Sequence, residues 1–374
     1  MTKKEYSRFW TILLSLLLLL TISFMTISCD DGGDDNDDPN DTLPNDTIPT
    51  DTIPADTLRP DSTGAGTIEL LTTLDMEGTW DEGMVIVDNC LYMCERWHIK
   101  ILDISNPESP VDIAEYPDHD HSNYTNCIRR QGDILAYTYT DGSNGVLHLA
   151  NIADRENPVL LGELEIGQSN SKIALNGNYA YLSANNEGIY IVDISDPTSP
   201  TLLSTEDVSG GSINLYLESN KLFSCNYTNG IVNIFDISSP EELTLVGACY
   251  PDCQQPQDVA VKWGSIFVAN GANTPPSNAG GFSIFDEISP ASSVYEDTLA
   301  SERSKSVFVD GNYAYVIYKY KFRVYGIYHP ESATLYHENT LEGLTGGFGN
   351  NIYVHENIIY ITAARKLYIY RHSY

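Results

Sequence analysis

Short runs of alternating apolar and polar residues cover most of residues 67–374, and turns join the runs into pairs. Residues 177–200 (GNYAYLSANNEGIYIVDISDPTSP) contain two such runs, an Asn/Gly turn between them and an Asp-Ile-Ser-x-Pro corner at the end. Alternation with a period of two predicts β-strands, and the short turn predicts a β-hairpin. The 25 Tyr of the chain favour the same interpretation, because aromatic side chains fit a pleated sheet.

The corner recurs along the chain, and its copies set the length of a repeat. It is complete at Asp103, Asp193 and Asp236, and degraded copies stand at Asn151, Asp286 and Gly326. Successive copies are 48, 42, 43, 50 and 40 residues apart. A further short run precedes most hairpins and another follows most corners. Each repeat therefore predicts four strands in about 44 residues, the size of one propeller blade.

The two ends of the repeat region complement each other. Six repeats end near Leu341, and residues 351–371 supply only three more runs. Residues 67–75 (TIELLTTLD) have the pattern of the missing fourth run. Sharing a blade between the two ends would close the ring and leave no open sheet edge. The sequence thus predicts an all-β fold, a β-propeller of seven four-stranded blades, with six or eight blades as alternatives.

The segments GIYIVDISDPTSP, KILDISNPESP and IVNIFDISSP resemble the LVIVD repeat, an aliphatic strand that ends in Val-Asp-Ile-Ser-x-Pro. The resemblance covers nearly all of residues 67–374 and is clearest in repeats one, three and four. It implies an exported bacterial propeller and no particular activity. We interpret each corner Asp as structural, because its carboxylate can accept backbone N–H bonds while the Pro ends the strand.

Residues 1–28 predict a signal peptide. Lys3, Lys4 and Arg8 precede the apolar residues 10–22, and Thr-Ile-Ser-Cys follows at residues 26–29. This tetrapeptide resembles the lipobox of bacterial lipoproteins, which implies that Cys29 becomes the acylated N-terminus. An ordinary signal peptide with a chance Cys is the alternative.

Residues 29–66 predict a disordered acidic tether, since residues 30–66 hold 11 Asp, one Arg and regularly spaced Pro. An acidic run after the acylated Cys resembles a surface-export signal of some Gram-negative lineages. It implies an outer-membrane lipoprotein exposed at the cell surface, with a periplasm-facing or inner-membrane location as the alternatives. The repeated Asp-Thr-aliphatic triplets also resemble a periplasmic O-glycosylation acceptor. The implied sites are Thr42, Thr47, Thr52, Thr57 and Ser62.

The formal net charge of −32 restricts the possible partners. Nucleic acids and anionic lipid surfaces require basic protein surfaces, so both are excluded as partners. We therefore expect membrane contact only through the lipid anchor, a monomeric propeller, and a protein or a glycan as partner.

The connections between strands two and three of a blade, and between successive blades, share the face at which propellers commonly bind ligands. Irregular polar and aromatic residues gather in these loops. The candidate binding residues are Arg96, Trp97, His98, His119, His121, Asn185, Tyr227, Asp252, Arg303 and Tyr320.

The segment Asp118-His119-Asp120-His121 could form a metal site with Asp252, His98 or Cys94, because two imidazoles with this spacing share one side of a strand. A solvated polar loop is the favoured interpretation, since no second cluster of ligands matches it. We therefore expect no metal and no cofactor.

No motif for nucleophilic catalysis or phosphate binding is present: Gly-x-Ser-x-Gly, His-Glu-x-x-His and the Walker loop are all missing. This favours a binding platform. An extracytoplasmic hydrolase or lyase with a dispersed site at the channel mouth is the alternative, and a structural part of an envelope complex is a third. Among the six Cys beyond Cys29, Cys249 and Cys253 flank a Pro-Asp turn and predict a disulfide, with buried free thiols as the alternative.

Overall fold

The computed structural model describes residues 66–77, 83–116, 124–141, 144–167, 172–184, 186–252, 255–271, 280–299, 302–344 and 349–374. All of them belong to the second of the chain's two units, Arg59–Tyr374. Strands dominate this part of the chain, which also contains one short 3-10 helix, η1 (Pro330–Ser332). No helix among these residues is long and apolar enough to cross a membrane.

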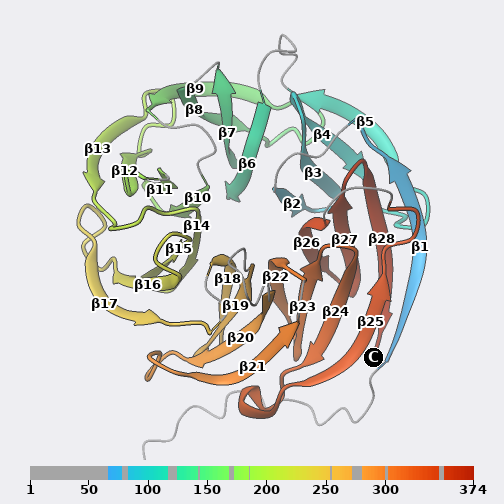
Figure 1. Ribbon diagram of the computed structural model, residues 1–374. Helices are drawn as coiled ribbons and strands as arrows, with labels where there is room; N and C mark the ends of the chain where they lie inside the picture. Colours follow the sequence, from blue (N-terminus) through green and yellow to red (C-terminus); the bar gives the residue numbers. More distant parts are fainter. Residues whose placement is uncertain are drawn as a thin grey trace, which may run out of the picture. The chain divides into compact units, whose positions relative to one another are not determined.

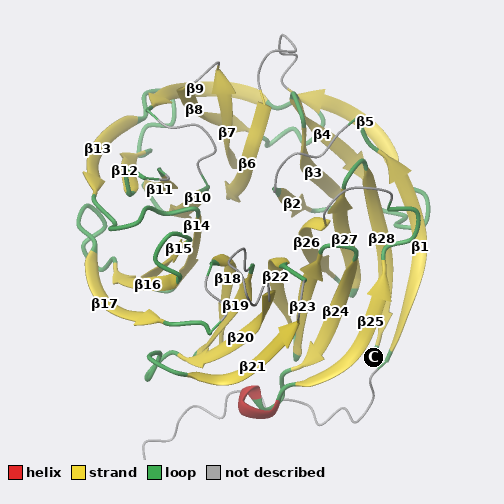
Figure 2. Ribbon diagram, viewed as in Figure 1, coloured by secondary structure: helices red, strands yellow, loops and turns green. Residues whose placement is uncertain are grey.

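The strands form seven antiparallel sheets of four strands each, which follow one another around an axis (Figures 1 and 2). Each of the seven innermost strands contacts the innermost strands of the two adjacent sheets, and β26 contacts β2, so the ring is closed. The protein is therefore a seven-bladed β-propeller, and the prediction of the fold is confirmed.

The strands of each blade are given from the axis outward. Blade one contains β2 (Met84–Val87), β3 (Cys90–Glu95), β4 (His98–Asp103) and β5 (Val111–Tyr116). Blade two contains β6 (Tyr124–Gln131), β7 (Ile134–Asp141), β8 (Asn144–Asn151) and β9 (Val159–Ile166). Blade three contains β10 (Ile173–Asn176), β11 (Tyr179–Ser183), β12 (Ile189–Asp193) and β13 (Thr201–Glu206). Blade four contains β14 (Asn214–Glu218), β15 (Lys221–Asn226), β16 (Ile231–Asp236) and β17 (Thr244–Cys249). Blade five contains β18 (Pro256–Lys262), β19 (Ser265–Asn270), β20 (Gly280–Asp286) and β21 (Ser293–Leu299). Blade six contains β22 (Ser304–Asp310), β23 (Tyr313–Tyr318), β24 (Lys321–Gly326) and β25 (Thr334–Thr340). Blade seven contains β26 (Gly349–His355), β27 (Ile358–Ala363), β28 (Lys366–Ser373) and β1 (Thr67–Asp75).

The seventh blade joins the two ends of the propeller, as the sequence predicted. Strand β1 pairs with β28 in an antiparallel register that runs from Thr67 opposite Ser373 to Asp75 opposite Lys366. The Lys366 ammonium also lies 2.8 Å from the Asp75 carboxylate. Because both sides of β28 are then paired, the last sheet has the same four-stranded form as the other six.

The core lies between the blades. Seven clusters of buried apolar side chains fill the spaces between successive sheets, and each cluster draws its members from two neighbouring blades. Many of the Tyr predicted to lie in strands are fully buried in these layers, and their hydroxyls reach the next blade. Tyr92 donates to the carbonyl of Arg155 (2.7 Å), and Tyr181 donates to that of Pro240 (3.0 Å).

The corner Asp residues stabilise turns, as the sequence analysis expected. Asp103, Asp193 and Asp236 each accept a hydrogen bond from the backbone N–H two residues later, at 2.7–2.8 Å. Asn151 makes the same bond at the degraded corner of blade two. At the corner of blade six, a Cβ on Gly326 would lie 2.6 Å from the ring of Tyr336, so the packing there excludes a side chain.

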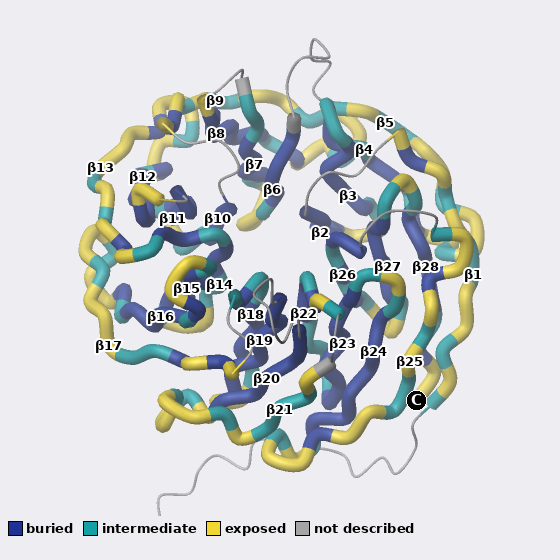
Figure 3. Tube along the Cα trace, viewed as in Figure 1, coloured by how far each residue is buried: buried dark blue, intermediate teal, exposed yellow. Residues whose placement is uncertain are grey.

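The outermost strands are the exposed edges of the blades (Figure 3). In every blade the pairing of the outermost strand shifts by one residue, which is a β-bulge; the shift lies near the start of the strand in blades one to six and in the middle of β1. A bulge twists an edge and interrupts its row of free hydrogen-bonding groups, so it hinders pairing with another chain.

Candidate functional site

The candidate residues chosen from the sequence fall into two groups. Arg96, Trp97, His98, Tyr227, Asp252, Arg303 and Tyr320 are described, and they lie in or beside the connections between strands two and three or between blades. The other positions lie outside the described residues: Cys29, Thr42, Thr47, Thr52, Thr57, Ser62, His119, His121, Asn185 and Cys253. Burial raises the pKa of the Cys249 thiol to about 12, and its disulfide with Cys253 stays a prediction.

Two cation–π pairs lie among the described loop residues. The guanidinium of Arg96 lies over the ring of Trp97, 4.1 Å from its centroid, and the ammonium of Lys319 lies 4.6 Å from that of Tyr320. Arg96 also has a positive φ of 47°, but Ala364 has a similar value in the corresponding turn of blade seven. The conformation of Arg96 therefore belongs to the turn and is not a mark of function.

His98 is part of a buried ionic cluster in blade one. Its Nε2 lies 3.4 Å from the carboxylate of the fully buried Glu95, and Lys100 lies 3.6 Å from the same carboxylate. The hydrogen bond to Glu95 raises the pKa of His98, although burial opposes the rise. Burial would raise the pKa of Glu95, but the bonds from His98 and from the Glu77 N–H lower it. His98 is thus already paired with Glu95, and the described residues contain no group suited to holding a metal ion.

A cavity lies on the axis, and none of the described candidate residues chosen from the sequence lines it. The cavity measures about 570 Å³ and is lined by residues of all seven innermost strands. The lining includes residues at the start of a strand, such as Asn214 of β14, and residues just after the end of one, such as Gly132 after β6. Pockets for small molecules commonly measure about 300–1,000 Å³, so one sugar or a molecule of similar size would fit.

The seven innermost strands contribute side chains to this axial cavity in layers. Each strand ends immediately before a residue with positive φ; these are Asp88, Gly132, Gly177, Ser219, Trp263, Gly311 and Glu356. The positions five residues before these turns supply the lining residues Lys172, Asn214, Asp258, Ser306 and Asn351. We call this set the first ring. The positions three residues before the turns supply Val85, Arg129, Ala174, Tyr216, Phe308 and Tyr353. We call this set the second ring.

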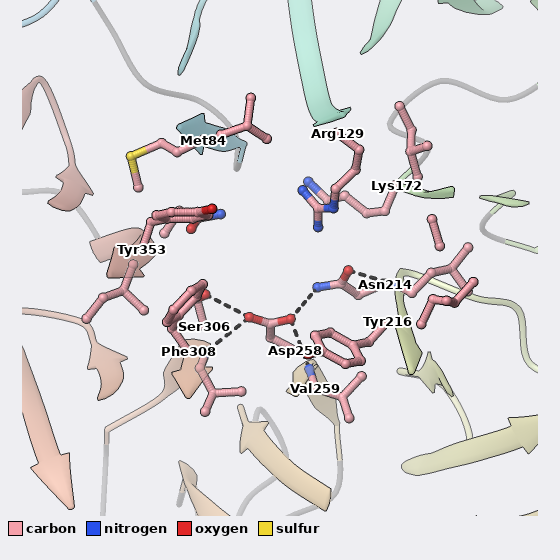
Figure 4. A pocket seen from close by; sticks show the side chains of 18 of the residues that line it. Met84, Arg129, Lys172, Asn214, Tyr216, Asp258, Val259, Ser306, Phe308 and Tyr353 are labelled. Atoms are coloured by element: carbon pink, nitrogen blue, oxygen red, sulfur yellow. Dashed lines mark hydrogen bonds between the residues drawn. The ribbon is translucent and has the colours of Figure 1, made fainter. Parts of the chain in front are cut away.

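Asp258, the first-ring residue of blade five, accepts hydrogen bonds from residues of blades four and six. Its Oδ1 accepts hydrogen bonds from the Asn214 side chain and the Val259 N–H, both at 2.9 Å (Figure 4). Its Oδ2 accepts from the Ser306 hydroxyl at 2.7 Å and from the Val307 N–H at 3.0 Å. The carboxylate is thus held by four donors, which fixes its position and leaves it poorly suited to act as a mobile general base.

Cations dominate the charge of the axial cavity. Its lining contains Arg129, Arg130, Lys172 and Lys305 but, among the described residues, only the carboxylate of Asp258. Figure 4 shows Arg129 and Lys172 projecting into the space from one side, with Tyr353 and Phe308 opposite. The pKa of Tyr353 is raised by burial, while Arg130 and Arg129 oppose the rise, so both guanidinium groups act across the cavity.

Aromatic and amide groups complete the lining. The rings of Phe308 and Tyr353 lie 4.8 Å apart at 45°, and Tyr216 donates a hydrogen bond to the Val261 carbonyl at 3.3 Å. Asn214, Asn350 and Asn351 bring amides to the same space. The axial cavity therefore combines apolar faces, hydrogen-bonding groups and positive charge.

The pattern of the repeats contains a signal for this site. Three consecutive repeats have a charged or amide residue at one equivalent position of the innermost strand: Lys172, Asn214 and Asp258. Aligning the repeats on the turn that follows this strand would have shown that the positions face one another.

The comparisons with known proteins agree with the fold. The profile of the LVIVD repeat matches residues 92–118, 167–207 and 303–320. The matches fall in blades one, three and six, whereas the motif looked clearest by eye in repeats one, three and four. No curated protein matches the chain at a significant level.

Two solved structures illustrate the architecture. The computationally designed Ika8 protein shares 12% identity, with a TM-score of 0.56 over 81% of this chain and 99% of that one. A chain in the crystal structure of the mitotic checkpoint complex shares 13% identity, with a TM-score of 0.62 over 83% of this chain and 96% of that one. At these identities the likeness shows the fold alone.

Proposed function

Because the chain is a seven-bladed β-propeller that carries LVIVD repeats, we propose that it is a binding protein whose ligand occupies the axial cavity. The observation that carries the proposal is the cavity itself, about 570 Å³ in volume and lined from seven strands. A ring of strands positions the lining side chains more rigidly than loops would, which favours a preformed binding site.

A glycan unit suits this cavity better than a protein segment does. Sugars present hydroxyl groups and apolar ring faces, which match the amide of Asn351 and the rings of Tyr216, Phe308 and Tyr353. Binding is favoured over hydrolysis because the one carboxylate among the described lining residues, Asp258, already accepts four hydrogen bonds. Glycosidases ordinarily need two carboxyl groups across the scissile bond.

The proposal includes a location at the cell envelope. The signal peptide of residues 1–28, acylation at Cys29 and the acidic tether of residues 29–66 would hold a monomeric propeller away from the outer membrane, exposed at the cell surface. A tether of this length spans on the order of 100 Å when it is extended. The propeller would then meet soluble or surface glycans without touching the lipid.

The experiment tests whether the ligand binds in the axial cavity or on the face formed by the connections between strands two and three and between blades, which we call the loop face. Binding of mono- and disaccharides to the mature protein is measured by isothermal titration calorimetry, for the parent and for two variants. Asn351→Trp places an indole in the axial cavity and should abolish binding. Tyr320→Ala removes an aromatic side chain from the loop face and should leave binding unchanged. Binding that survives Asn351→Trp and is lost in Tyr320→Ala would move the site to the loop face.

A further inference from the structure

The charge of the axial cavity is opposite to the charge of the chain. The chain has 52 acidic and 20 basic residues, yet four cationic side chains and one carboxylate stand among the described residues of the cavity lining. A cleft with one sign of charge concentrates ligands of the other sign, and low-dielectric walls strengthen this effect. The described lining of the axial cavity therefore differs in charge from the average composition of the chain.

Three arginines elsewhere in the propeller pair with carboxylates. Arg155 pairs with Asp88 and Asp133, at 3.0 and 2.9 Å. Arg323 pairs with Asp297 and Glu338, both at 2.7 Å. Arg371 pairs in the same way with Glu69 and Glu108. Arg96, Arg303 and Arg365 form no ion pair with a described carboxylate, so carboxylate pairing is common but not general among the arginines of the propeller.

Arg129 and Arg130 differ from Arg155, Arg323 and Arg371. Arg129 donates to the carbonyl of Ile128 at 2.8 Å, and Arg130 donates to that of Gly132 at 3.2 Å. Among the described residues neither forms an ion pair with a carboxylate. Burial opposes the rise in the pKa of Arg129, and the negative charge of the nearby Asp258 contributes to that rise. The two oxygens of Asp258 accept hydrogen bonds from Asn214, Ser306 and two backbone N–H groups. The guanidinium of Arg129 therefore keeps donors directed at the cavity (Figure 4).

From this arrangement we infer that the ligand of the axial cavity is a hydroxylated carboxylate, a uronic acid sugar in the first place, with Arg129 binding its carboxylate. The inference rests on the proposed function and specifies its ligand. A guanidinium presents two parallel N–H donors that match a carboxylate, and such a bidentate pair is both strong and directional. Lys172 in the first ring and Arg130 beside Arg129 add positive charge around the same position.

The rest of the lining suits the rest of such a ligand. The amide of Asn351 can bond to a ring hydroxyl, and Tyr353 and Phe308, opposite Arg129, offer apolar faces to the ring. An inorganic anion would use the cations but would leave this aromatic side of the cavity without a partner. The combination therefore favours an organic acid of about the size of one sugar.

The test compares acids with their neutral counterparts on the mature protein. Galacturonate and glucuronate are titrated by calorimetry against galactose and glucose at low salt. Each acid should bind at least tenfold more tightly than the neutral sugar, and the preference should shrink as sodium chloride is raised, because salt screens the attraction. Arg129→Gln should abolish the preference for acids, and Arg129→Lys should retain part of it. Arg371→Gln, which removes the same charge from a paired surface arginine, should leave it unchanged.

The outcomes separate the two claims. If galactose and galacturonate bind equally, or if Arg129→Gln keeps the preference for acids, the inference is overturned and the proposed function stands. If none of the four sugars binds, or if Asn351→Trp binds as well as the parent, both the inference and the proposed function are overturned. Circular dichroism and thermal melting check that each variant is folded. Arg130→Gln, which should weaken the same preference, replaces Arg129→Gln in the test if the latter does not fold.

Discussion

Replacing both Leu71 and Leu74 of β1 by Ala should destabilise the whole propeller, because these side chains fasten the N-terminal strand to the last blade. Both are partly buried against the apolar cluster between blades seven and one. A fully buried Leu→Ala substitution costs about 2–5 kcal/mol, so a partly buried one should cost about 1.5 kcal/mol. The two residues are roughly 10 Å apart along the strand, so their effects should add to about 3 kcal/mol.

The assay is thermal unfolding followed by circular dichroism, with Leu70→Ala as the matched control on the same strand. In a domain of this size 1 kcal/mol corresponds to about 2 °C in Tm, so the double variant should melt about 6 °C below the parent. Leu70 is 40% exposed, and its replacement should change Tm by about 1 °C at most. A double variant that melts within about 2 °C of the parent would refute the fastening role of β1.

Two chains truncated at the N-terminus test the role of β1 by keeping or removing the whole strand. A chain that begins at Gly66 keeps β1, whereas a chain that begins at Met76 lacks it and leaves one side of β28 unpaired. The shorter chain should aggregate or melt much earlier, because an exposed strand edge pairs with other molecules. If the two truncated proteins melt together and stay monomeric, closure by the shared blade is not needed for stability.

Four further predictions concern single positions. Asp193→Ala should lower Tm while Asp193→Asn largely preserves it. Since hydrogen bonds from Ser195 lower the pKa of Asp193, the deficit of Asp193→Ala should begin to shrink as the pH falls below about 4. His98→Gln should cost more stability at pH 6 than at pH 9, because a raised pKa stabilises the fold only while His98 is protonated; an equal cost at both values would contradict the pairing with Glu95. Cys29→Ser should move the protein from the detergent phase to the aqueous phase in Triton X-114 partitioning. The tether peptide that contains Thr47 should carry hexose increments in mass spectra of the native protein, and an unmodified mass would reject glycosylation.

The repeats made the fold predictable. The period-two runs predicted the strands, and the recurring corner predicted the length of the repeat and hence the size of a blade. The shortfall of one strand at residues 351–371 identified residues 67–75 as its partner. Every one of these features is local in sequence or repeats along it, so no knowledge of distant contacts was required. The corner Asp residues were also predictable, because their hydrogen bonds reach only two residues ahead.

The axial cavity could not be recognised in the same way. Arg129, Asp258 and Tyr353 are far apart in the sequence, and each looks like an ordinary polar or aromatic residue of a strand. Only closure of the ring places them around one space. The loop residues drew attention because they interrupt the strand pattern, and His98 illustrates the limit of that reasoning. Its partner Glu95 lies on the other strand of the same hairpin, and the pairing depends on which side chains the blade buries.

A crystal structure of the mature protein with galacturonate bound tests the central claim most directly. The account predicts electron density for one sugar in the axial cavity, with its carboxylate about 3 Å from the guanidinium of Arg129 and its ring beside Tyr353. Density for the sugar on the loop face beside Trp97 or Tyr227, with only water in the axial cavity, would contradict it.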